Sequence, residues 1–143
     1  MPNSRSDAYS YLERRFGIKE QELKPLTLRE RNGDFWLVKG ETELNIETDG
    51  IRALRVSNRG FKPTTYFLQL AGESIENNII NLSEEELEVL LDREMIERTG
   101  MEKGYVALEY DDMILGCGYF MNDKVSTRIS KSRSEHLRNI LDV

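Results

Sequence analysis

The chain has 143 residues, enough for one core of moderate size or two small lobes but not for two large domains. Its apolar residues make up 38% of the chain and are interleaved with charged ones, with no run of 18 or more, which excludes a membrane-spanning segment. The single cysteine excludes an internal disulfide, and the first residues lack the apolar core of a secretory signal, so we expect a cytoplasmic protein.

The net charge of −6 argues against a nucleic-acid ligand unless the charges are unevenly distributed. Residues 1–62 carry 12 basic and 10 acidic side chains, residues 63–123 carry 3 and 14, and residues 124–143 carry 5 and 2. Segment 51–62 contains four basic residues and no acid: Arg52, Arg55, Arg59 and Lys62. Positive charge is therefore clustered, and so is negative charge.

The first 40 residues show two clear local patterns. Ser6 can cap a helix over 7–16, and Gly17 supplies a left-handed stop after it. Asn32-Gly33, between two apolar stretches, is the strongest short signal for a hairpin. We therefore expect a helix followed by a β-hairpin over about 26–39.

A second antiparallel pair is expected on a weaker pattern. Leu44 and Ile46 alternate with polar residues ahead of Asp49-Gly50. Apolar residues then recur over 51–56, as they would in a half-buried return strand.

The turn-rich stretch 57–60 interrupts this pattern. Apolar residues then alternate over 66–70, which predicts a half-buried strand. We place a boundary at the break, between an N-terminal α/β lobe at 1–58 and a second domain at 59–143.

The clearest helix signal begins at Ser83. Ser83 with Glu86 forms the pattern of a capping box, and Leu82 and Leu87 occupy the two hydrophobic-staple positions. Apolar residues then recur at helical spacing, which predicts a helix over about 84–98.

From Gly104 onward the chain reads as three strands: 104–110, 113–121 and 125–129. Asp111-Asp112 and Asn122-Asp123 are the turns between them. Gly116 and Gly118 leave one face of the middle strand bare, as a small closed barrel requires. Ser134 can cap a short final helix.

No pattern of reactive groups points to catalysis. Cys117 is expected to be a buried strand residue, His136 lies on a polar terminal helix, and Asp111-Asp112 reads as a turn. No set of metal ligands has usable spacing, and no cofactor loop is present in the sequence. We therefore expect neither an enzyme nor a metal or cofactor site.

Two charged segments have alternative interpretations. The acidic residues over 84–97 are most simply the solvated face of a helix, but Glu85, Glu88 and Asp92 could also dock a basic partner. The C-terminal cluster is either a solvated tail or a nucleic-acid contact rich in hydroxyl neighbours. Its basic members are Lys124, Arg128, Lys131 and Arg133.

Three segments in order resemble PUA-type RNA-binding domains. They read FKPTTYFLQL (61–70), NLSEEELEVLLDREMI (81–96) and GYVALEYDDMILGCGYFMNDKVSTRISKSR (104–133). The nearest resemblance is to the PUA-like C-terminal region of Nop/Sun-type RNA cytosine-5 methyltransferases. The front half is similar to the short α/β lobe that precedes such domains in pre-ribosome factors. The methyltransferase motifs of that family do not occur in this chain.

The resemblance implies an α+β fold, with an N-terminal α/β lobe followed by a PUA-like β pseudo-barrel and flanking helices. It also implies a protein that binds structured rRNA or tRNA in ribosome biogenesis or RNA modification. Because the methyltransferase motifs are missing, we expect it to be non-catalytic, and we expect a monomer. The expected RNA contacts are Arg55, Arg59, Lys62, Lys124, Arg128, Lys131 and Arg133. An RNA methyltransferase or a ribosomal protein is a further expected partner. The alternative is an adaptor that docks a basic partner or an RNA-modifying enzyme through its acidic helix.

Overall fold

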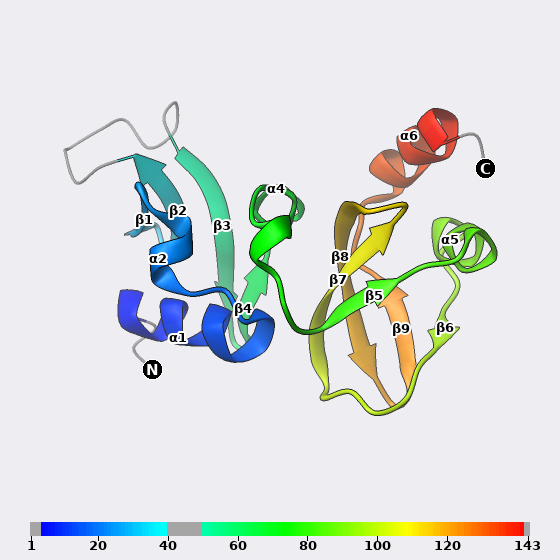
Figure 1. Cartoon of the computed structure of the whole chain (residues 1–143), viewed down its shortest axis with the longest axis horizontal. Helices are drawn as coiled ribbons and strands as arrows, with labels where there is room; N and C mark the ends of the chain where they lie inside the picture. Colours follow the sequence, from blue (N-terminus) through cyan, green and yellow to red (C-terminus); the bar gives the residue numbers. More distant parts are fainter. Residues whose placement is uncertain (1–3, 40–49, 142–143) are drawn as a thin grey trace. The chain divides into compact units, whose positions relative to one another are not determined.

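The computed structural model describes residues 4–39 and 50–141. The chain divides into two compact units, one ending at Asn77 and the other beginning at Asn78, and each is built on one β-sheet with helices (Figure 1). This is the expected α+β class. The predicted boundary after residue 58 falls instead within a hairpin of the first unit, because Ser57 pairs with Gly60 across that turn.

The N-terminal unit is a four-stranded antiparallel meander, ordered β1-β2-β3-β4. Its elements are α1 (Arg5–Phe16), α2 (Glu20–Leu23), β1 (Leu26–Arg31), β2 (Asp34–Lys39), β3 (Gly50–Ser57), β4 (Gly60–Pro63), α4 (Thr65–Leu70) and the 3-10 turn η1 (Gly72–Ser74). Leu44, Ile46 and Asp49 of the second predicted pair lie outside the described residues. β3 pairs with β2 in the antiparallel sense.

Helix α1 begins earlier than predicted because Ser4, rather than Ser6, is its cap. The Ser4 hydroxyl accepts a hydrogen bond from the Asp7 N–H at 3.1 Å, and the Asp7 carboxylate accepts one from the Ser4 N–H at 3.0 Å. Gly17 ends the helix as expected, with a left-handed φ of 74°.

The hairpin at Asn32-Gly33 is confirmed, and the strand predicted over 66–70 is wrong. Asn32 and Gly33 have φ of 53° and 87°, the left-handed pair that a tight two-residue hairpin requires. Segment 65–70 is helix α4, and Thr64 is its N-cap, because the Thr64 hydroxyl accepts a hydrogen bond from the Phe67 N–H at 3.2 Å. Phe67 and Leu68 are the residues buried there, so the apolar alternation did not mark the buried face.

The C-terminal unit is a five-stranded mixed sheet that curls into a half-barrel, ordered β5-β7-β8-β9-β6 (Figure 1). Its elements are β5 (Ile79–Asn81), α5 (Glu84–Leu91), β6 (Ile96–Glu97), β7 (Gly104–Tyr110), β8 (Met113–Met121), β9 (Lys124–Thr127) and α6 (Lys131–Leu141). β5 and β7 are parallel, and the other neighbours are antiparallel.

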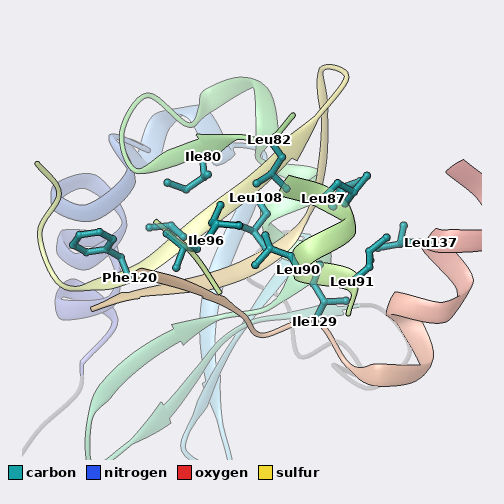
Figure 2. Close-up of a cluster of buried hydrophobic side chains, with 13 residues drawn as sticks. Ile80, Leu82, Leu87, Leu90, Leu91, Ile96, Leu108, Phe120, Ile129 and Leu137 are labelled. Carbon is teal, nitrogen blue, oxygen red and sulfur yellow. The ribbon is translucent and has the colours of Figure 1, made fainter. Parts of the chain in front are cut away.

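The core of this unit lies between one face of the sheet and helices α5 and α6. Figure 2 shows Leu90 and Leu91 of α5 between Leu108 of β7 and Leu137 of α6. A Cβ on Gly118 would lie 2.9 Å from Leu108 Cδ2, so the glycine is what allows Leu108 to pack against β8. The side chain of Leu108, on the neighbouring strand β7, therefore packs against the strand face that the glycines were expected to leave bare.

Helix α5 starts with the predicted Ser83–Glu86 capping box but ends at Leu91, well before residue 98. Arg93 has a φ of 68°, and the N–H groups of Arg93 and Glu94 donate to the carbonyls of Leu90 and Val89, the pattern of a Schellman stop. The prediction failed because this stop is formed by an arginine, which carries no sequence signal for the left-handed region.

The C-terminal hairpins form at the predicted turns, since Asp111, Asp112, Asn122 and Asp123 all have left-handed φ between 51° and 63°. The final helix does not start at Ser134. It starts after Ser130, whose hydroxyl accepts from the Arg133 N–H at 3.2 Å. Ser134 is instead buried within the helix and accepts a hydrogen bond from Arg93 Nη1 at 3.1 Å.

Candidate nucleic-acid interface

The seven basic residues predicted to contact RNA form two groups, one in each unit. Those of the C-terminal unit follow one another from β9, through the residue directly after it, to the first turn of α6: Lys124, Arg128, Lys131 and Arg133. Those of the N-terminal unit lie on the β3–β4 hairpin: Arg55, Arg59 and Lys62.

In the C-terminal group, Lys124 and Arg128 lie on the face of the sheet opposite the core. Val125, Thr127 and Ile129 are buried, whereas the alternate residues of this segment retain exposure. Successive side chains of a strand point to opposite faces. Lys124, Ser126 and Arg128 therefore lie in a row on the outer face of the half-barrel.

Arg128 is held in place by an aromatic ring. Its guanidinium carbon lies 5.1 Å from the ring centroid of Tyr119, and its Nη1 donates to the Ser126 hydroxyl at 3.1 Å. Tyr119 in turn meets Tyr105 edge to face, with centroids 4.9 Å apart. Because Tyr105, Tyr119 and Ser126 are cross-strand partners, they form one row over β7, β8 and β9.

This aromatic row was missed in the sequence. The two-residue turn at Asp111-Asp112 alone would set Tyr105 opposite Gly118 and place Tyr119 on the core face. A β-bulge opposite Leu108 and Glu109 shifts the register by one residue, so that Tyr105 faces Tyr119 instead. The extra residue is Leu115, next to Gly116; a glycine within a strand often marks a bulge, but it does not specify how the register changes.

The N-terminus of a helix normally favours anions, but the first turn of α6 carries two cations. Lys131 and Arg133 lie in this turn, where the N–H groups and the helix dipole create positive potential. Neither side chain forms an ion pair within residues 4–39 and 50–141. A bound anion would offset the resulting repulsion and use the free N–H donors.

Lys124 differs from its neighbours because it is partly neutralised. Its Nζ lies 3.5 Å from Glu97 Oε1 of the adjacent strand β6, and both side chains are largely exposed. Such a pair contributes little to stability, so Lys124 can exchange Glu97 for another anion at small cost.

On the N-terminal unit, Arg55 and Lys62 are direct cross-strand partners on the face opposite Leu54 and Phe61. Like charges placed opposite each other destabilise a strand pair, and an anion between them would relieve this. Arg59 lies in the connecting turn, where its N–H donates to the Ser57 hydroxyl at 3.2 Å. In the described part of the chain, none of the three has a carboxylate partner.

The acidic helix α5 is partly neutralised within its own unit. Asp92 accepts a hydrogen bond from Arg138 of α6 at 2.7 Å. Glu86 is bound by both terminal nitrogens of Arg98, and this hydrogen bonding is the main reason that the pKa of Glu86 falls to about 2. Glu85 and Glu88 remain exposed.

The residues considered for catalysis in the sequence analysis differ in exposure and in the elements that carry them. Cys117 is buried in β8, whereas His136 is exposed on α6. Asp111 and Asp112 form a turn. Over residues 4–39 and 50–141, no group of three or more histidine, cysteine or carboxylate side chains could hold a metal ion.

Among the helices of these same residues, none is long and apolar enough to cross a membrane. Sequence comparisons found no match for the chain among protein-family models or among curated proteins.

Proposed function

We propose that the protein binds structured RNA, rRNA or tRNA, without catalysing a reaction, and acts in ribosome biogenesis or RNA modification. The observation that carries this proposal is Arg128, held over Tyr119 beside the basic first turn of α6. The resemblance of residues 61–133 to PUA-type domains supports it. So does the curled sheet covered by two helices, which is compatible with a PUA-like pseudo-barrel.

The chemistry of this outer face suits a phosphate backbone. Stacking on Tyr119 and the bond to Ser126 fix the plane of the Arg128 guanidinium, which leaves its other N–H groups available to phosphate oxygens. Lys131 and Arg133 add charge, and the helix start adds N–H donors. Double-stranded RNA is recognised mainly through phosphates, 2′-hydroxyls and shape, so we expect weak sequence preference.

The proposal is tested by titrating a fluorescently labelled tRNA transcript with the full chain at several KCl concentrations. The logarithm of affinity should fall linearly with the logarithm of salt, with a slope of about 0.7–0.9 per phosphate neutralised. Arg128→Gln and Arg133→Gln should each lower both affinity and slope. Arg138→Gln is the matched control, because it removes one charge from the same helix at a position engaged with Asp92.

Two results would overturn the proposal. One is affinity that does not change with salt, and the other is equal affinity in the Arg128, Arg133 and Arg138 variants. In either case the adaptor alternative would gain support. That alternative requires Glu85→Lys and Glu88→Lys to abolish capture of a basic partner, such as a ribosomal protein or an RNA methyltransferase, without loss of RNA affinity. It has less support at present because Asp92 and Glu86 are already paired.

A further inference from the structure

The N-terminal sheet has a basic face with an aromatic residue at its centre. We propose that this face binds an unpaired nucleotide, with the base stacked on Trp36 and the flanking phosphates on Arg52, Arg55 and Lys62. The inference rests on the proposed RNA binding and adds to it a second site that takes single-stranded RNA.

The core side of this sheet is defined by aromatic contacts. The ring of Phe61 lies 6.0 Å from Phe35 and 5.3 Å from Tyr11 of α1, measured between centroids. Leu54 pairs with Phe35 and is fully buried. Strand alternation therefore directs the side chains next to these residues, including Trp36, to the opposite face. We call this opposite face the basic face.

A β-bulge brings two arginines of one strand onto the basic face. Arg52 and Arg55 are three residues apart, so a regular strand would point them to opposite sides. Phe35 pairs with Leu54 but Trp36 pairs with Arg52, which leaves Ala53 as an extra residue in β3. Bulges of this kind re-aim side chains. As a result, Arg52 and Arg55 both lie on the side of Trp36.

Trp36 lies between two arginines in a row across three strands. It is the cross-strand partner of Arg29 on β1 and of Arg52 on β3. The guanidinium carbon of Arg52 is 5.2 Å from the Trp36 ring centroid. Trp36, Arg29 and Arg52 are all half-buried, so each keeps part of its surface in contact with solvent.

The charges on the basic face are complementary to nucleic acid. Among the residues described on this face, one acid, Asp34, lies beside the basic side chains; it is 3.7 Å from Arg52 Nε and accepts a hydrogen bond from the Val56 N–H at 2.9 Å. Alternation and cross-strand pairing place five basic residues on this face: Arg29, Arg31, Arg52, Arg55 and Lys62. The face is not open throughout, because Val38 and Ala53 are buried.

This combination favours a single-stranded ligand over a duplex. Bases stack on aromatic and guanidinium planes only when they are unpaired, and cations along the same surface hold the backbone. Except at its two ends, a duplex presents no base face to Trp36. A basic face without an aromatic residue would fit duplex and single strand alike, so Trp36 decides between them.

Trp36 is the only tryptophan of the chain, so its intrinsic fluorescence reports this site without a label. The full chain is titrated with an oligouridylate of about eight nucleotides and, separately, with a blunt RNA duplex. Saturable quenching by the oligouridylate and none by the duplex is the expected result. Trp36→Ala should weaken oligouridylate binding by about tenfold, and Trp36→Phe by less, because a phenyl ring still stacks.

The controls separate failure of this inference from failure of the proposed function. Tyr66→Ala, at an exposed aromatic residue of α4, should leave oligouridylate affinity unchanged, and Trp36→Phe covers the case in which Trp36→Ala misfolds. If anisotropy shows RNA binding while Trp36 fluorescence and Trp36→Phe affinity stay unchanged, the inference is overturned and the proposed function stands. If the oligouridylate quenches Trp36 but structured RNA does not bind, the proposed function fails and the site remains.

Discussion

The guanidinium carbon of Arg128, the residue directly after β9, lies 5.1 Å from the ring centroid of Tyr119 on the neighbouring strand β8. This contact fixes the direction of a side chain that would otherwise sample many rotamers, so it lowers the entropy lost when Arg128 binds phosphate.

The first prediction concerns the ring that orients Arg128. Tyr119→Phe keeps the ring and should hold tRNA affinity within about twofold, whereas Tyr119→Leu should lower it by about three- to tenfold. Fluorescence anisotropy with labelled tRNA measures both. Equal affinity of the Leu and Phe variants would mean that the stacking does not contribute to binding.

The second prediction concerns Glu86, whose pKa is lowered from 4.5 to about 2. The largest cause is its hydrogen bond to Arg98; burial acts in the opposite direction, and the hydrogen bond from the Ser83 N–H lowers the pKa further. Because the folded-state pKa is below the unfolded value, the stabilisation is fully present above about pH 4.5 and is lost as pH falls toward 2. The shift alone corresponds to about 3 kcal/mol, but both side chains are more than a quarter exposed, so we expect about 1–2 kcal/mol.

Glu86→Gln tests this, since glutamine can still complete the capping box with Ser83 but cannot pair ionically with Arg98. Urea unfolding at neutral pH should show the loss of about 1–2 kcal/mol, and the difference from the parent chain should shrink at about pH 2–3. Glu85→Gln, one residue away and exposed, is the control and should change stability by less than about 0.5 kcal/mol.

The third prediction concerns Arg93, which has a left-handed φ of 68° and whose Nη1 donates to the Ile129 carbonyl and the Ser134 hydroxyl. Arg93→Ala should cost about 1–3 kcal/mol, because it leaves these buried acceptors without a donor; the penalty of the left-handed φ is the same for alanine as for arginine. Arg93→Gly loses the same bonds but relieves the φ, so it should be more stable than the alanine variant by about 1 kcal/mol.

Urea unfolding of the two Arg93 variants gives the order directly. Alanine more stable than glycine at this position would contradict a left-handed helix stop. A double-mutant cycle with Ser134→Ala should show coupling to Arg93 of about 0.5–2 kcal/mol. Glu94→Ala, next to Arg93 and exposed, serves as the control.

The fourth prediction concerns Gly118, where a Cβ would lie 2.9 Å from Leu108 Cδ2 and 3.0 Å from the Ser126 carbonyl oxygen. Gly118→Ala should destabilise the protein by about 1–3 kcal/mol through overpacking, because a strand carbonyl cannot move away freely. In a Leu108→Ala background the same substitution should cost less, since one of the two clashes is gone. Thermal or urea unfolding of the single and double variants measures the difference, and strict additivity would rule out the clash with Leu108.

Features encoded by a few adjacent residues were predictable from the sequence. Asn32-Gly33 and the aspartate and asparagine turns specify left-handed φ, and these turns form where expected. Ser83 and Glu86 form their capping box. These signals work because the groups that satisfy one another lie within three residues along the chain.

The helix over 65–70 and the early end of α5 were not predictable in the same way. The apolar residues of 66–70 fit a strand as well as a helix, and Thr64 resolves the ambiguity by capping the helix while donating to the Arg52 carbonyl of β3 at 2.6 Å. Arg93 stops α5 where its side chain can reach Ile129 and Ser134, which are about 40 residues further along the chain. Both outcomes depend on partners distant in sequence.

The sequence by itself determined which segments carry positive charge, where the tight turns lie and where α5 begins at its Ser83–Glu86 capping box, because these depend on residue type and near neighbours. The tertiary structure decided which side of each sheet those charges occupy. Two bulges, at Ala53 and opposite Leu108 and Glu109, place Arg52 beside Arg55 and set Tyr119 against Tyr105. One extra residue reverses the facing of a whole strand, and strand pairing fixes its position.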